Sequence, residues 1–501
     1  MSENLQKLKD RMRQLSRLGE VAAIVSWDQN TYMPSGAANA RAEQASTLSA
    51  FTHELFTSDL TGDLLAKSEA DTVGMNEDSD ERRMLSNLRR DFDKATKLPA
   101  DLVADLAHHS SIAQEIWISA RKENSFASFA PALEKMFDLT RRQAECLGYK
   151  DHIYDALIDL YEPGARQAEV ATMFADMKPS LVALNHAISE SKNPVDDSIL
   201  HRSFPVATQR EFTLKAAAQF GYDLNHGRQD EAPHPFCTSF SRDDVRITTR
   251  FDPNFFSMAF YGTLHETGHA LYEQGVPAEF EQTPIGGATS LGIHESQSRM
   301  WENMVGRSRS YAQFIFPQLQ TAYPEAYRGS TSEAYYRAVN KVSPSLIRVE
   351  ADEVTYNLHI LLRFELECEL LTEKLAIKDL PEAWNSRMEE YLGITPDSDA
   401  NGCLQDVHWS CGLVGYFPTY SIGNLVSGQL WNSIKKVHSD IDAQFAKGEF
   451  ANLLSWLRQN VHSKGSKYLP KELVEMATGE KLTSKYYMDY LQAKYKDIYS
   501  L

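Results

Sequence analysis

Residues 252–275 read DPNFFSMAFYGTLHETGHALYEQG, and this stretch predicts a helix that presents a pair of histidines. The opening Asp-Pro pair suits a helix cap and first turn, and Gly275 is a natural stop. His265 and His269 stand four residues apart, so on a helix both imidazoles point to one side. Two imidazoles presented in this way can bind one Zn²⁺ ion.

Glu266 follows the first histidine, where a carboxylate can take a proton from metal-bound water. The bare pattern arises by chance in about 3 of 100 chains of this composition, so a surface helix with two unrelated histidines stays open. Gly268 argues against that alternative, because glycine costs a helix interior about 1 kcal/mol. Its presence predicts a close approach of another backbone or of a metal.

A catalytic zinc site needs a third protein ligand and one open position. Glu295, in the stretch HESQSR at 294–299, is the candidate, and we expect it to open a second helix that runs through Val305. His294 is a rival ligand, but neighbouring side chains on a helix diverge. No third histidine follows the first pair at short range, which argues against a metzincin site. Structural zinc sites often use cysteine ligands, and the absence of a cysteine beside the pair argues against such a site.

Apolar residues recur at helical spacing along most of the chain, for example at Leu358, Leu361 and Leu362. Residues 240–251 include alternating β-branched and polar side chains, which predicts a strand. We predict a mainly α fold with a small sheet near the middle, built as a single two-lobed domain over residues 1–501. Breaks in the helical pattern are expected at 68–80, 191–197, 225–235 and 395–402.

The charge balance is acidic, with 69 acidic against 51 basic residues and a net charge of −18. Such a surface repels phosphate backbones and anionic lipid, so nucleic-acid and membrane partners are not expected. The five cysteines are scattered and form no CxxC pair, which indicates reduced thiols. The first fourteen residues lack the apolar core of a signal peptide. We therefore expect a cytoplasmic protein.

Six short motifs, in a fixed order, resemble those of the carboxypeptidase Taq family of metallocarboxypeptidases, and the similarity covers essentially the whole chain. No motif position departs from the family pattern, and Trp27-Asp28-Gln29 resembles the family's opening segment. The motifs are His234-Pro235-Phe236, Asp244-Val245-Arg246-Ile247-Thr248, His265 to His269, His294-Glu295-Ser296-Gln297, Ile347-Arg348-Val349-Glu350-Ala351-Asp352 and Gly402-Cys403-Leu404-Gln405-Asp406-Val407-His408-Trp409.

The resemblance implies a helical fold similar to neurolysin and angiotensin-converting enzyme. A deep groove would separate two lobes, with a helical N-terminal part over its mouth. It also implies a HEXXH metalloprotease that removes single residues from peptide C-termini, with broad preference and with proline disfavoured. One Zn²⁺ per chain, a tolerance for Co²⁺ and a homodimer are further expectations from the family.

An exopeptidase must recognise the free α-carboxylate of its substrate, and the planar guanidinium of arginine suits that group. Arg348 is the first candidate because it lies in a family motif, and Arg246 on the expected strand is the second. The alternative for each is a structural ion pair, in the case of Arg348 with Asp352 on one helix face.

The oxyanion that forms during hydrolysis needs donors besides the metal. By resemblance to the related helical peptidases these are His408 and Tyr420, with Tyr416 as a substitute for Tyr420. Gln405 and Asp406 are expected to contact the substrate or to support other site residues. Two other functions stay open: an oligopeptidase that cuts inside short peptides, and a catalytically silent peptide-binding protein.

Overall fold

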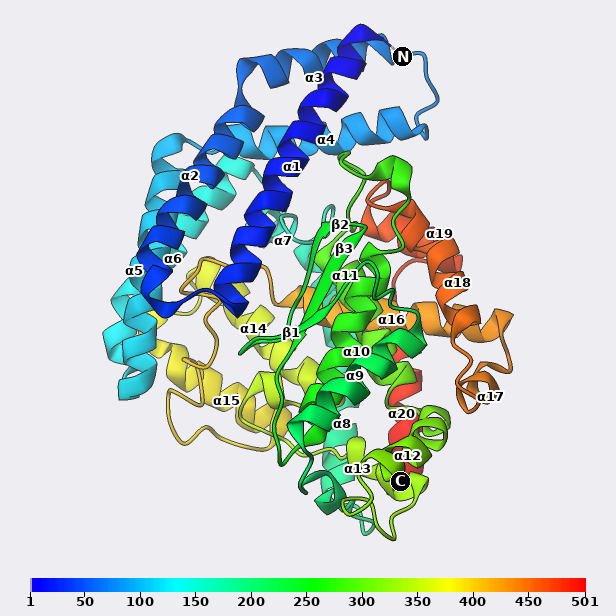
Figure 1. Cartoon of the computed structure of the whole chain (residues 1–501). Coiled ribbons are helices and arrows are strands. Elements are labelled where there is room, and N and C mark those ends of the chain that lie inside the picture. Colours follow the sequence, from blue (N-terminus) through cyan, green and yellow to red (C-terminus); the bar gives the residue numbers. More distant parts are fainter. Residues whose placement is uncertain (1) are drawn as a thin grey trace.

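Helices make up 66% of the chain and surround one three-stranded sheet, which confirms the predicted mainly α fold (Figure 1). The structure is a computed structural model that describes residues 2–501. The first six helices form the blue-to-cyan part of Figure 1 and stand beside and above the sheet. They are α1 (Glu3–Thr31), α2 (Ala38–Thr57), α3 (Asp59–Asp71), α4 (Asp80–Lys97), α5 (Ala100–Glu123) and α6 (Phe126–Leu147).

The remaining helices lie mostly below and to the right of the sheet in Figure 1 and enclose most of the apolar core. They are α7 (Tyr154–Ile158), α8 (Gln167–Ser189), α9 (Val206–Phe220), α10 (Phe256–Glu273), α11 (Leu291–Arg299), α12 (Arg309–Ala322), α13 (Ser332–Val339), α14 (Tyr356–Leu371), α15 (Leu380–Leu392), α16 (Pro418–Val437), α17 (Ile441–Phe445), α18 (Ala451–Asn460), α19 (Pro470–Thr478) and α20 (Lys485–Tyr499).

The sheet has the strand order β1-β3-β2, in which β1 (Gln229–Glu231) is parallel and β2 (Cys237–Ser241) antiparallel to β3 (Asp244–Thr249). The predicted strand at 240–251 therefore corresponds to β3, while its first residue, Phe240, belongs to β2. β1 lies within the expected break at 225–235. Its three polar residues carry no alternating pattern, so only its pairing with β3 makes it a strand.

The helix predicted at 252–274 is α10, but it begins at Phe256 instead of Asp252. The side chain of Asp252 accepts a hydrogen bond from the backbone N–H of Asn254, at 2.7 Å, and so closes a turn before the helix. Gly268 allows the close approach of a backbone. A Cβ at this position would lie 2.6 Å from the carbonyl oxygen of Gln297 on α11. The glycine therefore sets α10 and α11 close together.

The second predicted helix starts earlier than expected, at Leu291, where the hydroxyl of Ser290 accepts the N–H of Ile293 at 3.1 Å. After α11 the chain continues as a π-helical segment, Met300–Val305. Such wide turns are rare in proteins, and those that occur are often found at functional sites.

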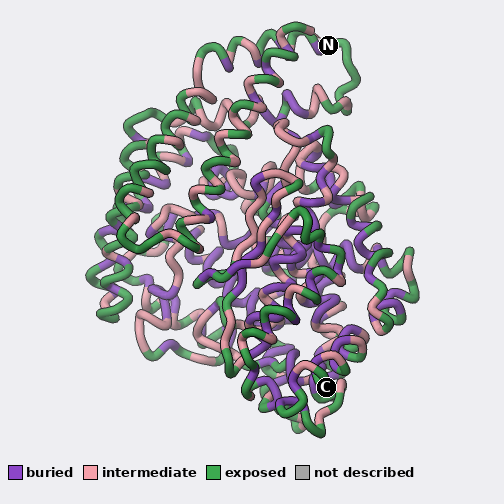
Figure 2. The backbone as a smooth tube through the Cα atoms, viewed as in Figure 1, coloured by how far each residue is buried: buried purple, intermediate pink, exposed green. Residues whose placement is uncertain are grey.

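Two separate apolar clusters hold the fold together, and Figure 2 shows buried backbone concentrated in the centre. The large cluster joins residues from α5 to α20. The small one lies between α1, α3, α4 and the loop that follows α10, with Leu5, Leu85 and Phe280 among its members. No helix between residues 2 and 501 is long and apolar enough to span a membrane.

Glu162, in the loop after α7, forms a hydrogen bond with the first turn of α11. Its carboxyl accepts the backbone N–H of Gly292, and a Cβ on that glycine would lie 2.6 Å from the same oxygen. Only 2% of Glu162 is exposed. Burial raises its pKa to about 8, although the hydrogen bonds from Ser290 and Gly292 favour the ionised form.

This pKa predicts a pH-dependent contribution to stability. Between about pH 4.5 and pH 8 the folded carboxyl keeps its proton while the unfolded one loses it, so the free energy of unfolding falls as pH rises. At about 1.4 kcal/mol per pKa unit the loss is on the order of a few kcal/mol. Thermal unfolding of the protein and of Glu162→Gln at several pH values measures it. The stability difference between the two should shift in favour of Glu162→Gln as pH rises from 5 to 8.5, and a constant difference contradicts the assignment.

Candidate active site

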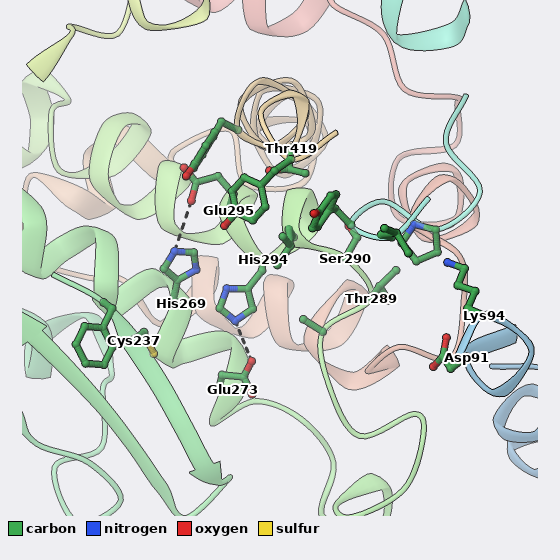
Figure 3. Close-up of a pocket in the computed structure, with 18 of the residues that line it drawn as sticks. Asp91, Lys94, Cys237, His269, Glu273, Thr289, Ser290, His294, Glu295 and Thr419 are labelled. Carbon is green, nitrogen blue, oxygen red and sulfur yellow. Dashed lines mark hydrogen bonds and ion pairs between the residues drawn. The ribbon is translucent and has the colours of Figure 1, made fainter. Parts of the chain in front are cut away.

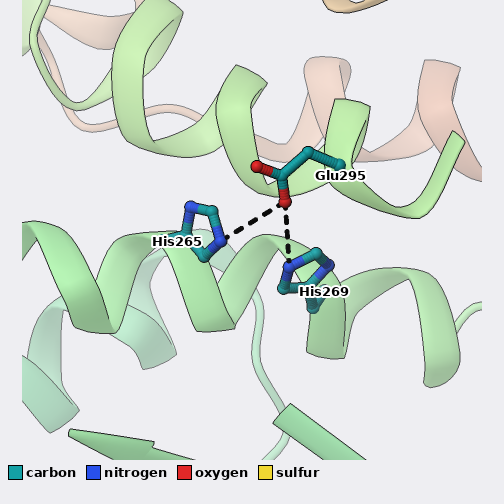
Figure 4. Close-up of side chains that lie close together, drawn as sticks. All are labelled: His265, His269 and Glu295. Atoms are coloured by element: carbon teal, nitrogen blue, oxygen red, sulfur yellow. Dashed lines mark ion pairs between the residues drawn. The ribbon is translucent and has the colours of Figure 1, made fainter. Parts of the chain in front are cut away.

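His265, His269 and Glu295 converge between α10 and α11, with one possible ligand atom from each within 4.8 Å of the others (Figure 4). The Nε2 atoms of both histidines lie 3.5 Å from Oε2 of Glu295. A tetrahedral ion with bonds of about 2.1 Å places its ligand atoms about 3.4 Å apart. Two imidazole nitrogens and one carboxylate oxygen, with both nitrogen-to-oxygen distances near this value, fit a divalent metal ion and would leave a fourth position open.

Glu302, in the π-helical segment, holds the first histidine in position. Its Oε2 lies 2.9 Å from Nδ1 of His265, which fixes the ring with Nε2 facing Glu295. With a metal ion bound, the proton would stay on Nδ1 and the lone pair of Nε2 would face the ion. Arg299 and Arg307 also contact the carboxylate of Glu302, at 3.4 and 3.3 Å. The helix and the π turn that follows it thus place Glu295 and Glu302 against the two ring nitrogens of His265, with Arg299 paired to both carboxylates.

Buried charge is balanced around the site. Arg299 donates to Oε1 of Glu295 at 2.7 Å, and its charge holds the pKa of that carboxyl well below the usual range although burial opposes the shift. Burial also opposes ionisation of Glu302, but the hydrogen bond with His265 and the charge of Arg299 lower its pKa to about 2. Both carboxylates therefore stay ionised at neutral pH.

We expect Glu302→Gln to weaken metal binding by about 10- to 100-fold, the usual cost of losing the partner of a ligating histidine. The amide can still fill the space, but it no longer supplies the negative charge that raises the basicity of His265. Chelator competition with Zn²⁺ measures the change. An unchanged dissociation constant would show that the contact with Glu302 does not orient the ring.

Glu266 is 6% exposed and lies between the two histidines in sequence. Burial raises the pKa of its carboxyl to about 7, with the charge of His265 acting in the opposite direction. The side chain borders the same cavity as His265 and His269. A carboxyl with a pKa near neutrality at this place can both take and return a proton.

The cavity beside these residues has a volume of about 1000 Å³ and extends from His265, His269 and Glu295 to α4. Figure 3 shows His269, His294 and Glu295 at one end and Asp91 and Lys94 at the other. Its walls come from α4 and the loop after α7 on one side, and from β2, α10, α11 and α16 on the other. Such a cavity can accommodate a short peptide.

Tyr416 and Tyr420 both line the cavity, with ring centroids 5.5 Å apart. The hydroxyl of Tyr420 lies 3.5 Å from Nε2 of His408, so the structure brings the predicted histidine and tyrosine together. Burial lowers the pKa of His408 to about 4 and raises that of Tyr420 well above its usual range. Both groups are therefore neutral at pH 7 and can donate a hydrogen bond.

Arg348 lies behind this pair, 5% exposed, with its guanidinium 5.1 Å from the ring centre of Tyr420. It donates to Asp406 at 2.8 Å and to the hydroxyl of Tyr356 at 3.1 Å. The ion-pair partner expected from the sequence, Asp352, instead caps the turn at Thr355. Residues 348–350 form a 3-10 turn, so positions 348 and 352 do not share an α-helical face.

The other predicted substrate contacts are also engaged within the protein. Gln405 accepts the N–H of Arg348 at 2.9 Å and donates to the carbonyl of Leu346 at 2.9 Å. Arg246 forms a two-point pair with Asp244, and its guanidinium lies over the rings of Trp27 and Phe240. None of the four candidates, Arg246, Arg348, Gln405 and Asp406, belongs to the cavity wall.

Sequence reasoning missed Arg299 and Glu302. A signal was present, because they follow Glu295 by four and seven residues and so share a helical face. The spacing places these side chains on one helical face, but only the packing of α10 against α11 brings them to His265.

The helix with its two histidines, the glutamate on the following helix and the peptide-sized cavity define the class of helical metallopeptidases. Residues 7–495 match the family model of the carboxypeptidase Taq (M32) metallopeptidases. The chain belongs to this family and is a carboxypeptidase, a hydrolase of peptide bonds.

Relatives with curated names match this chain over nearly their whole length. The chain is 42% identical to thermostable carboxypeptidase 1 of Thermus thermophilus, over 99% of this chain and 98% of the relative. It is 36% identical to carboxypeptidase 1 of Bacillus subtilis, over 98% of both. Among solved structures, the M32 carboxypeptidase of Deinococcus radiodurans superposes with a TM-score of 0.96 at 41% identity, over 100% of both chains. A Pyrococcus furiosus carboxypeptidase superposes with a TM-score of 0.96 at 39% identity, over 99% of both.

Proposed function

We propose that the protein is a zinc-dependent carboxypeptidase that releases single C-terminal amino acids from peptides, with broad preference and with proline disfavoured. His265, His269 and Glu295 hold one metal ion, and Co²⁺ can replace Zn²⁺ there. The observation that carries the proposal is the convergence of these three side chains, 3.5 Å from nitrogen to oxygen, at the end of a peptide-sized cavity. Membership of the carboxypeptidase family supports the exopeptidase mode.

A bound Zn²⁺ ion would lower the pKa of a water molecule toward neutrality and polarise the scissile carbonyl. Glu266 takes the proton from the attacking water and returns it to the leaving amine, as its buried position beside the ligands allows. Tyr420 and His408 donate to the oxyanion, and Tyr416 stays an alternative to Tyr420 because both line the cavity.

Arg348 is our proposed anchor for the substrate carboxylate, with Arg246 as the alternative. Arg348 is favoured by its place beside Tyr420, because its guanidinium lies 5.1 Å from the centre of a ring that lines the cavity. Asp406 and Gln405 hold Arg348 ready, and a substrate carboxylate would have to reach it past that ring. In Arg246 the guanidinium stacks on Trp27 at 4.6 Å, which favours a structural role.

The test compares a short free-acid peptide with its C-terminally amidated twin, using zinc-loaded protein. The proposal predicts stepwise release of amino acids from the free acid alone, abolished by a chelator. Arg348→Gln should raise KM for the free acid, whereas Arg246→Gln, which tests the alternative anchor, should leave KM unchanged. The reverse result would make Arg246 the anchor. Equal cleavage of both peptides would instead identify an internal-cutting oligopeptidase, and no cleavage would identify a silent peptide-binding protein.

A homodimer is the assembly we propose, formed through α1 and α2. α2 has no buried residue, and Val21, Ile24 and Phe51 are each close to half exposed, at 49%, 46% and 48%. A groove of about 520 Å³ runs between the two helices. With a net charge of −18, two copies repel each other unless they meet on a charge-poor face such as this one. Light scattering of the protein and of Phe51→Glu distinguishes dimer from monomer.

We further propose that residues 1–501 act as one domain and that the protein is cytoplasmic. The large apolar cluster, which runs from α5 to α20, supports a single unit. All five cysteines are free thiols, which fits a reducing compartment.

A further inference from the structure

The two histidines of the candidate metal site are supported in different ways. Nδ1 of His265 has a carboxylate partner in Glu302, at 2.9 Å. Nδ1 of His269 is buried and has no hydrogen-bond partner within residues 2–501. The second ring is therefore not oriented by a hydrogen bond from the protein, although a metal ligand needs a fixed ring plane.

The ring of His294 lies against His269 instead. Their centroids are 4.4 Å apart and their planes differ by 23°, a stacked arrangement. His294 is itself fixed, because its Nε2 lies 2.8 Å from Oε1 of Glu273. Glu273 stands one helical turn after His269 on α10, and Figure 3 shows His294 between these two side chains.

The stack continues away from the metal site. Tyr272 lies 5.6 Å from His294, and its other neighbour is His462, stacked at 5.0 Å and 29°. His462 ends the row with a hydrogen bond between its Nε2 and Oε1 of Gln297, at 2.9 Å. The row from His294 to His462 is held by a hydrogen bond at each end, to Glu273 and to Gln297. It therefore gives His269 a rigid neighbour on one face.

We propose that His294, held by Glu273, is a positioning residue that orients the His269 ligand through ring stacking. Nε2 of His294 is directed at Glu273, and His294 does not join the group of possible ligand atoms. An imidazole ring is otherwise free to rotate over a broad range about its last torsion. Stacking on a fixed ring selects the plane in which Nε2 of His269 faces Glu295. The inference rests on the proposed metal site.

The test uses two variants of His294 that distinguish the effect of its flat ring from the effect of its ring nitrogens. His294→Phe keeps the stacking face but cannot bind a metal or Glu273, and His294→Leu removes the flat face. We expect the zinc dissociation constant, from chelator competition, to rise less than about twofold in His294→Phe and about tenfold in His294→Leu. The visible absorption of the Co²⁺-loaded protein should change in the Leu variant alone.

His201 supplies a matched control, because it stacks on Phe255 at 4.7 Å and 3° and belongs to neither the metal ligands nor the cavity wall. His201→Leu should leave zinc binding unchanged, and thermal unfolding of the metal-free variants shows that each is folded. Equal losses in His294→Phe and His294→Leu, or no loss in either, overturn the inference. A wild-type protein that fails to bind zinc overturns the proposed metal site instead.

Discussion

Replacing Glu266 by glutamine is expected to lower kcat by about 10³-fold, within the range for removal of a general base. The amide has nearly the same shape, so the metal ligands keep their places, and the zinc dissociation constant should stay within about threefold. The physical reason is the lost carboxylate. Burial raises the pKa of Glu266 to about 7, which suits it to accept and return a proton, and an amide can do neither.

The measurement is the single-turnover rate of amino-acid release by zinc-loaded protein, with bound metal determined on the same sample. Glu365→Gln is the control, because Glu365 pairs with Lys178 at 2.9 Å and lies off the cavity wall. A Glu266→Gln protein that binds zinc normally and keeps more than a tenth of the rate would remove Glu266 from the mechanism.

Glu295→Gln is expected to weaken zinc binding by more than about 100-fold, beyond the cost of losing an outer partner. A neutral amide is a poorer ligand, and the change also leaves the charge of Arg299 without its 2.7 Å partner. Removing one member of a buried ion pair costs about 3–5 kcal/mol, and Glu302 at 3.4 Å offsets part of it.

Two readouts separate these effects. Chelator competition reports the ligand, and denaturant unfolding of the metal-free protein reports the unpaired Arg299. A ligand role predicts that zinc affinity is lost while the free energy of unfolding of the metal-free variant falls by less than about 5 kcal/mol. Unchanged zinc affinity in a folded variant would exclude Glu295 from the ligands.

The sequence predicted those features that depend on short-range spacing. Two histidines four residues apart share a helix face whatever the rest of the fold does, and Gly268 signalled the close approach of a neighbouring backbone. The helix boundaries were predicted less accurately. α10 begins at Phe256 because Asp252 closes a turn instead of capping the helix.

Features that depend on long-range packing could not be predicted in this way. Arg348 pairs with Asp406, 58 residues away, because the turn at 348–350 faces the loop before α16. β1 is a strand only through its pairing with β3. The contact of Glu302 with His265 needs both the π turn and the packing of α11 on α10.

Anomalous diffraction above the zinc edge, from crystals of the zinc-loaded protein, tests the central claim most directly. The account predicts one strong peak per chain, about 2 Å from Nε2 of His265, Nε2 of His269 and a carboxylate oxygen of Glu295. A peak bound by His294, or one at another place in the chain, would contradict it.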